Sequence, residues 1–115
     1  MVIAVIADIV GSRSLSDRGV AQRRLDDAIA QAERDRPLAL QPLTPTVGDE
    51  QQAVYGDLEG AMTSLLMIHL ALPDGIGLRF GLGVGEVRRV DSAHGALPDG
   101  PGWWAAREAI ELAHE

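Results

Sequence analysis

The sequence contains no cysteine, which excludes disulfide bonds and thiol chemistry and is typical of a reducing compartment. Aromatic residues are scarce, with one tyrosine, one phenylalanine and two tryptophans, so the core must be built from aliphatic side chains. The longest apolar stretch, residues 62–72, is too short to span a bilayer and is interrupted by His69. Because no signal peptide is visible either, we expect a cytoplasmic protein.

Basic residues are outnumbered, with 10 Lys and Arg against 17 Asp and Glu, and the net charge is −7. A surface this acidic repels phosphate backbones and anionic membranes, so we expect no direct contact with nucleic acid or membrane. Any phosphate ligand would have to arrive with its own cation. The length of 115 residues indicates a single domain, residues 1–115.

Two acidic segments stand beside strand-like runs. The sequence Ala-Asp-Ile-Val-Gly-Ser at residues 7–12 closes an apolar run, and Val-Gly-Asp-Glu at residues 47–50 separates two further strand-like runs. If these strands are neighbours, the carboxylates of Asp8 and Asp49 converge at one end of the sheet. Hard oxygen ligands of this kind suit a magnesium ion that carries phosphates, so the pair predicts a metal site.

The periodicity predicts an α+β fold. The predicted strands are residues 2–7, 40–46, 51–55 and 78–87, and the predicted helices are residues 17–35, residues 57–72 and a last helix from Pro101. This is the βαββαβ order of a ferredoxin-like domain plus one C-terminal helix. We expect the first strand at the centre, the first two helices on one face, and residues 40–46 at an edge because Pro42 and Pro45 interrupt them.

Three helical rows are expected to face inward. They are Ala21, Leu25, Ala28, Ile29 and Ala32; then Leu58, Ala61, Met62, Leu65 and Leu72; then Trp103, Ala106, Ile110 and Ala113. In residues 78–87 one strand face is mostly glycine, so another backbone or a ligand should lie close to it. Residues 88–100 read as a polar loop. One of the adjacent Trp103 and Trp104 must point outward, which predicts a subunit contact and a homodimer.

These segments resemble the catalytic domains of class III nucleotidyl cyclases, and resemble the bacterial SatD family more closely. The SatD-like stretches are residues 7–13, residues 47–50 and Asp-Gly-Pro-Gly-Trp at residues 99–103. The resemblance implies that Asp8 and Asp49 bind Mg²⁺ and that Arg107 steadies a transition state. It also implies that phosphates meet the backbone of the turn made by Ile9, Val10, Gly11, Ser12 and Arg13. The implied ligand is a nucleoside triphosphate or another phosphate compound.

Other cyclase positions are not kept. The lysine that reads the base would fall at Pro45, a second base-reading residue near Ala96, and the asparagine that accompanies Arg107 at Trp103. Cyclase domains and SatD proteins continue beyond the matching helix, so we also expect this chain to be an N-terminal fragment of a longer protein.

Three functions therefore stand open: a non-catalytic, nucleotide- and magnesium-responsive regulatory domain, a dimeric two-metal nucleotidyl cyclase or transferase, and an association module without a ligand. The plain structural alternatives are that Asp8 caps a helix, that Asp49 forms a turn and that Arg107 pairs with an acid on the surface. Glu50 is expected to face solvent, and His69 to be a structural residue of its helix.

Overall fold

The computed structural model of the chain describes residues 1–10, 18–46, 50–93 and 95–114. Its elements are β1 (Val2–Val10), α1 (Arg18–Asp35), β2 (Ala39–Pro45), β3 (Glu50–Tyr55), α2 (Leu58–Ala71), β4 (Gly77–Gly85), β5 (Arg88–Ser92), β6 (Gly95–Asp99) and α3 (Pro101–Ala113). The α+β class and the ferredoxin-like order predicted from the sequence are confirmed. Among the described helices, none is long and apolar enough to cross a membrane.

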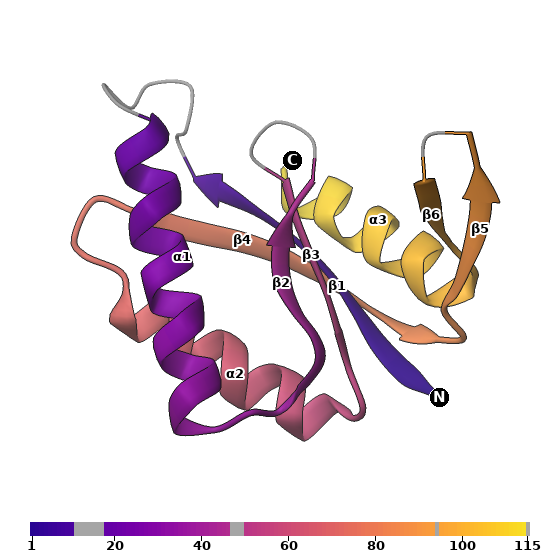
Figure 1. The fold of residues 1–115 in the computed structure, drawn as a ribbon, viewed down its shortest axis with the longest axis horizontal. Coiled ribbons are helices and arrows are strands. Elements are labelled where there is room, and N and C mark those ends of the chain that lie inside the picture. Colours follow the sequence, from indigo (N-terminus) through magenta and orange to yellow (C-terminus); the bar gives the residue numbers. More distant parts are fainter. Residues whose placement is uncertain (11–17, 47–49, 94, 115) are drawn as a thin grey trace.

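The main sheet has the strand order β2-β3-β1-β4, and every neighbouring pair is antiparallel. β1 is central as predicted, because its continuous apolar run is buried on both faces. β2 lies at an edge, also as predicted, and two register shifts interrupt its pairing with β3 in the region of Pro42. Helices α1 and α2 cover one face and α3 covers the other (Figure 1).

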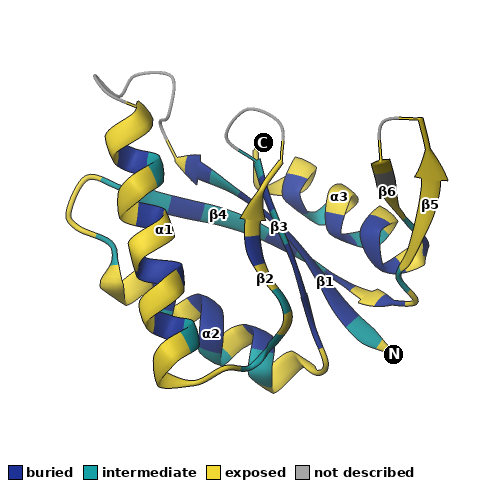
Figure 2. Cartoon of the chain, in the orientation of Figure 1, coloured by how far each residue is buried: buried dark blue, intermediate teal, exposed yellow. Residues whose placement is uncertain are grey.

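The larger core lies between the sheet and the α1–α2 layer, and Figure 2 shows the buried stripe of each helix turned towards it. The five residues predicted to face inward from α1 are all buried. In α2 the prediction was wrong for Leu58 and Met62, which are about half exposed, at 53% and 51%. Asp57 caps this helix as predicted, since its Oδ1 accepts a hydrogen bond of 2.7 Å from the Gly60 amide.

The second core lies under α3 and depends on glycine. It contains Ala4 and Ile6 of β1, Val54 of β3, and Trp103, Ala106 and Ile110 of α3. A Cβ added at Gly81 would lie 2.6 Å from the Ala106 carbonyl oxygen, and one added at Gly83 would collide with the Gly102 carbonyl oxygen. The sequence prediction that a backbone lies close to the glycine face of β4 is therefore confirmed. The prediction was wrong for Ala113, which was expected to face inward and is exposed.

Two boundaries differ from the sequence prediction. Residues 88–100 are not a loop: Arg88 pairs with Asp99 and Ser92 with Gly95, which makes β5 and β6 a separate hairpin. β1 runs on to Val10, so Asp8 lies inside the strand and not in a turn after it. The reason is that β4 pairs with β1 along its whole length, up to the Val10–Gly77 pair.

The contact between β4 and α3 predicts a large effect of one methyl group. Gly83→Ala should destabilise the fold by about 3 kcal/mol or more, because the clash is with helix backbone, which cannot rotate away as a side chain can. Urea unfolding of wild type and variant measures the loss. Gly56→Ala is the matched control, since nothing lies within 4 Å of a Cβ at Gly56. Equal midpoints for the two variants would contradict this packing.

Candidate functional site

A row of charged side chains crosses the sheet beneath α3. Asp8 of β1 stands directly opposite Glu50 of β3 on one side and Arg79 of β4 on the other. Residues directly opposite one another in antiparallel strands point to the same face. That face is the α3 face, because Ala4 and Ile6 on the same side of β1 pack against α3. Glu50, Asp8 and Arg79 therefore lie side by side on the sheet under α3, and we call them the charged row.

Helix α3 supplies two bases to this row. Arg107 donates two hydrogen bonds to Glu50, with Nη1 to Oε1 at 2.6 Å and Nη2 to Oε2 at 2.9 Å. His114 places Nε2 at 2.6 Å from Asp8 Oδ2. The two bases are seven residues apart, which is about two helical turns, so they project from the same side of α3. Each acid of the row is thus paired with a base of α3.

Glu50 is held by more than Arg107. Gln52 Nε2 donates to Glu50 Oε2 at 3.2 Å, and the Thr46 hydroxyl donates to the Glu50 backbone oxygen at 3.2 Å. The hydrogen bonds from Arg107 are the main reason that the pKa of Glu50 is lowered, and burial opposes them. Glu50 in turn raises the pKa of Arg107. The expectation that Glu50 faces solvent was wrong, since its side chain is only 24% exposed.

Asp8 is less completely satisfied. Its side chain is 14% exposed, and Arg79 Nε lies 3.5 Å from Oδ1. Neither Asp8 Oδ1 nor Arg79 Nε has a hydrogen-bond partner among the described residues, although both atoms are buried. A buried acceptor without a partner is costly, so this oxygen would gain from a stronger ligand. It is the one hard ligand of the predicted metal pair that the structure describes.

The other predicted ligands divide into two sets. Ile9 and Val10 lie in β1 and not in a loop: Ile9 is buried in the core under α1 and α2, and Val10 pairs with Gly77. Gly11, Ser12, Arg13 and Asp49 lie outside the described residues, so phosphate and metal binding there stay predictions. Among the described residues there is no group of three or more His, Cys, Asp or Glu that could hold a metal.

Magnesium nevertheless fits what is described. A magnesium ion that arrives with phosphates is bound by one or two carboxylates and keeps several waters. Asp8 provides one such carboxylate, and one of its oxygens has no hydrogen bond from residues 1–10, 18–46, 50–93 or 95–114. When bound, the ion would neutralise phosphate charge next to β1.

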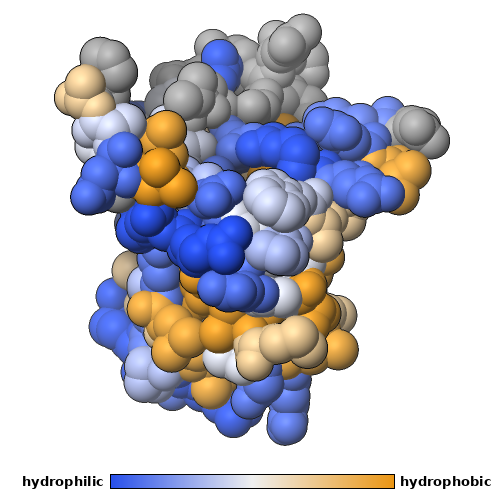
Figure 3. Space-filling view, turned by 90° about the vertical axis from the view of Figure 1, so that its right-hand side faces the viewer, coloured by the Kyte–Doolittle hydropathy of each residue, from blue (hydrophilic) through white to orange (hydrophobic). Residues whose placement is uncertain are grey.

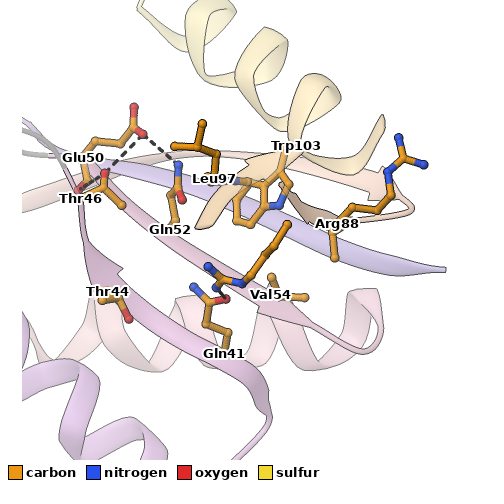
Figure 4. A pocket seen from close by; sticks show the side chains of 12 residues that line it. Gln41, Thr44, Thr46, Glu50, Gln52, Val54, Arg88, Leu97 and Trp103 are labelled. Atoms are coloured by element: carbon orange, nitrogen blue, oxygen red, sulfur yellow. Dashed lines mark hydrogen bonds between the residues drawn. The ribbon is translucent and has the colours of Figure 1, made fainter. Parts of the chain in front are cut away.

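A cleft of about 770 Å³ opens beside the row. It lies between the β2–β3 half of the sheet and the β5–β6 hairpin, and Trp103 of α3 is one of its lining residues (Figure 4). Its polar lining includes Gln41, Thr44 and Gln52, and Arg89 Nη2 donates to Gln41 Oε1 at 2.6 Å. Glu50 and Thr46 form the end of the cleft that adjoins the charged row. Clefts of this size and mixed lining are typical of small-molecule sites.

The sequence reasoning missed Arg79 and His114 as members of the site. The sequence did contain a signal for Arg79. It is the charged residue on the strand face of residues 78–87 that is mostly glycine. The signal for His114 was its spacing of seven from Arg107. His69, expected to be structural, is exposed on α2 and lies away from this row.

The family is established by comparison. The sequence model of the SatD family matches residues 2–115. The chain belongs to the SatD family. No curated protein matches it in sequence.

Solved structures similar to this SatD-family chain are nucleotidyl cyclase domains. A bacterial light-regulated adenylyl cyclase is 14% identical, with a TM-score of 0.71 over 99% of this chain and 70% of that one. The guanylate cyclase domain of RhGC from Catenaria anguillulae, in complex with GTP, is 17% identical, with a TM-score of 0.64 over 94% and 71%. An adenylate/guanylate cyclase/hydrolase from Silicibacter pomeroyi is 22% identical, with a TM-score of 0.61 over 97% and 70%. At these identities the similarity shows the cyclase-like fold.

The ion pair of Arg107 with Glu50 predicts a specific pH dependence. Because the folded-state pKa of Glu50 is lowered, the stability from this pair is complete above the ordinary pKa of glutamate, about 4.3. It is lost as the pH falls through the lowered pKa. Arg107→Met should therefore cost roughly 1 kcal/mol near neutral pH and much less at about pH 3.

Urea unfolding at both pH values measures this. Glu50→Gln and the double variant complete a mutant cycle that isolates the pair. A cost of Arg107→Met that is the same at both pH values would show that Arg107 acts through packing and not through the charge of Glu50.

Proposed function

We propose that this chain is a regulatory domain that binds a nucleoside triphosphate with Mg²⁺ and does not cyclise it. The observation that carries the proposal is that the acidic side chains of the charged row are already paired with basic side chains of the same chain. Arg107, which occupies the place that the resemblance gives to a transition-state donor, is held by two hydrogen bonds to Glu50. A catalytic donor must be free to meet the charge that develops on the phosphate. Here that charge would have to compete with a carboxylate.

The neighbouring position supports the same reading. Trp103 stands where a cyclase has an asparagine, and it is buried between α3 and the sheet. An indole offers one N–H and no acceptor, and a buried ring cannot turn towards a phosphate without opening the core. Ligand binding needs less than catalysis does. Within the part of the chain that the structure describes, Asp8 has a carboxylate oxygen without a hydrogen-bond partner, and the cleft lined by Glu50 provides polar groups.

We propose that the domain acts as a homodimer. Trp104 is 59% exposed and is the outward member of the tryptophan pair, which fits a subunit contact. In this proposal a phosphate ligand is bound through its metal, since the net charge of −7 disfavours direct attraction of anions.

An association module without a ligand is the second candidate, and a surface feature favours it. Four large apolar residues of α2 recur at intervals of four and are all exposed: Leu58, Met62, Leu66 and Leu70. Apolar surface also gathers elsewhere. Figure 3 shows a hydrophobic band across the lower part of the face at the end of the molecule that carries the N-terminus. Exposed apolar patches often mark protein contacts.

Ligand binding is tested by thermal denaturation of wild type and Asp8→Asn with ATP or GTP, with and without magnesium. Wild type should melt at a higher temperature only when metal and triphosphate are both present, because a ligand that binds the folded state stabilises it by mass action. Asp8→Asn should lose that shift. Asp91→Asn, which removes the same charge at an exposed position of β5, should keep it. A wild type indifferent to both nucleotides would leave the association module as the better reading.

The same variant tests the structural setting of Asp8. Without ligand, Asp8→Asn should destabilise the fold by about 1–3 kcal/mol, since Arg79 and His114 would lose their carboxylate. Urea unfolding without metal measures this cost separately from any ligand effect.

The absence of catalysis is a further expected outcome. Wild type incubated with ATP or GTP and Mg²⁺ or Mn²⁺ should form no cyclic nucleotide above a blank, as measured by chromatography. Glu50→Gln frees Arg107 but leaves Trp103 in place, so it should not create activity. Cyclic product that disappears in Arg107→Met would make the chain a cyclase.

A further inference from the structure

His114 contacts one of the two carboxylate oxygens of Asp8. His114 is at the C-terminal end of α3, the helix that covers the charged row, and its Nε2 lies 2.6 Å from Asp8 Oδ2. Arg79 faces the other carboxylate oxygen from β4 at 3.5 Å. Asp8 is thus placed between two bases of its own chain. The histidine is the more accessible of the two, with 48% of its side chain exposed against 37% for Arg79.

The two oxygens of Asp8 are not equally well bound. Oδ2 has a short contact with His114, whereas Oδ1 is buried and has no hydrogen bond among the described residues. A metal ion would satisfy Oδ1 and would compete for Oδ2, because ligated carboxylates direct their lone pairs to the ion. The side of Oδ2 that His114 Nε2 contacts at 2.6 Å cannot hold a metal ion at the same time. Arg79 extends from the sheet, whereas His114 follows the last turn of α3, where residues 111–114 are exposed.

The last turn of α3 is weakly held apart from this contact. The last buried residue of the helix is Ile110, and residues 111–114 are all exposed. The His114 amide closes the helix by hydrogen bonds to the carbonyl oxygens of Glu111 and Leu112. Helix ends with few buried contacts open at little cost in free energy. The side chain of His114 contacts Asp8 of β1 from this turn.

We infer that His114 is an internal competitor for cations at Asp8, so that metal binding at Asp8 and docking of the last turn of α3 exclude each other. The inference rests on the proposed function in one respect, the use of Asp8 as a metal ligand. It adds that metal occupancy is coupled to the C-terminal turn of α3. His114 sets the affinity of the site for its cation, and the cation releases the turn.

The direct test measures Mn²⁺ binding by electron paramagnetic resonance in wild type, His114→Ala and the control His69→Ala. His69 is exposed on α2, so its loss should leave the dissociation constant unchanged. His114→Ala should bind Mn²⁺ about fivefold more tightly, the factor that corresponds to the loss of one competing hydrogen bond of about 1 kcal/mol. His114→Gln, which keeps a side-chain donor, should fall between the two. Equal affinity in wild type and His114→Ala would overturn the inference.

A second measurement follows the helix itself. Amide hydrogen exchange of residues 111–114 in wild type should become faster when Mg²⁺ is added, while exchange in the buried part of α3 should not change. In His114→Ala these amides should exchange fast with or without Mg²⁺. Unchanged exchange in a wild type saturated with Mg²⁺ would also overturn the inference.

Asp8→Asn separates this inference from the proposed function. Mn²⁺ binding that needs Asp8 but is indifferent to His114 would overturn the competition and leave the proposed function intact. Mn²⁺ binding that is unchanged in Asp8→Asn, or absent from every variant, would overturn both.

Discussion

The close approach of α3 to β4 is the constraint on which the rest of this structure depends. A helix can lie this near a strand only where the strand carries no side chain, and Gly81 and Gly83 provide that space. With the helix backbone resting on the strand, Trp103, Ala106 and Ile110 close a second core against β1 and β3. The same close packing determines how far Arg107 and His114 lie from the sheet and towards which strands their side chains point. Without the glycines, neither base would reach the acids of the sheet.

The consequence is a site in which acids meet bases of the same chain. In a site built for phosphate chemistry, preorganised donors face the place where negative charge develops. In this chain Arg107 faces Glu50, and His114 faces Asp8. The fold of a cyclase domain is kept, while the polar groups of the row are directed at one another. On this basis we propose a domain whose ligand changes contacts within the chain and is not converted.

Much of the fold could be predicted because its signals are local. The five inward residues of α1 follow the helical period, the prolines of β2 mark an edge, and Asp57 caps α2 by a hydrogen bond within its own turn. Predictions were less accurate where pairing between distant segments decides. β1 extends past Asp8 because β4 pairs with it, and residues 88–100 form a hairpin because Arg88 and Asp99 align. Neither partner is visible from the segment alone.

The candidate site shows the same division. The family resemblance, the order of elements and an acid near the end of a central strand, Asp8, could all be recognised in the sequence. It also determined the glycines that allow α3 to approach. Only the tertiary structure decided which charges meet, because Glu50, Asp8 and Arg79 come together through strand register and meet Arg107 and His114 through helix packing. Local periodicity specifies which face a residue occupies, whereas the partner across that face depends on the register and approach of segments up to 106 residues apart.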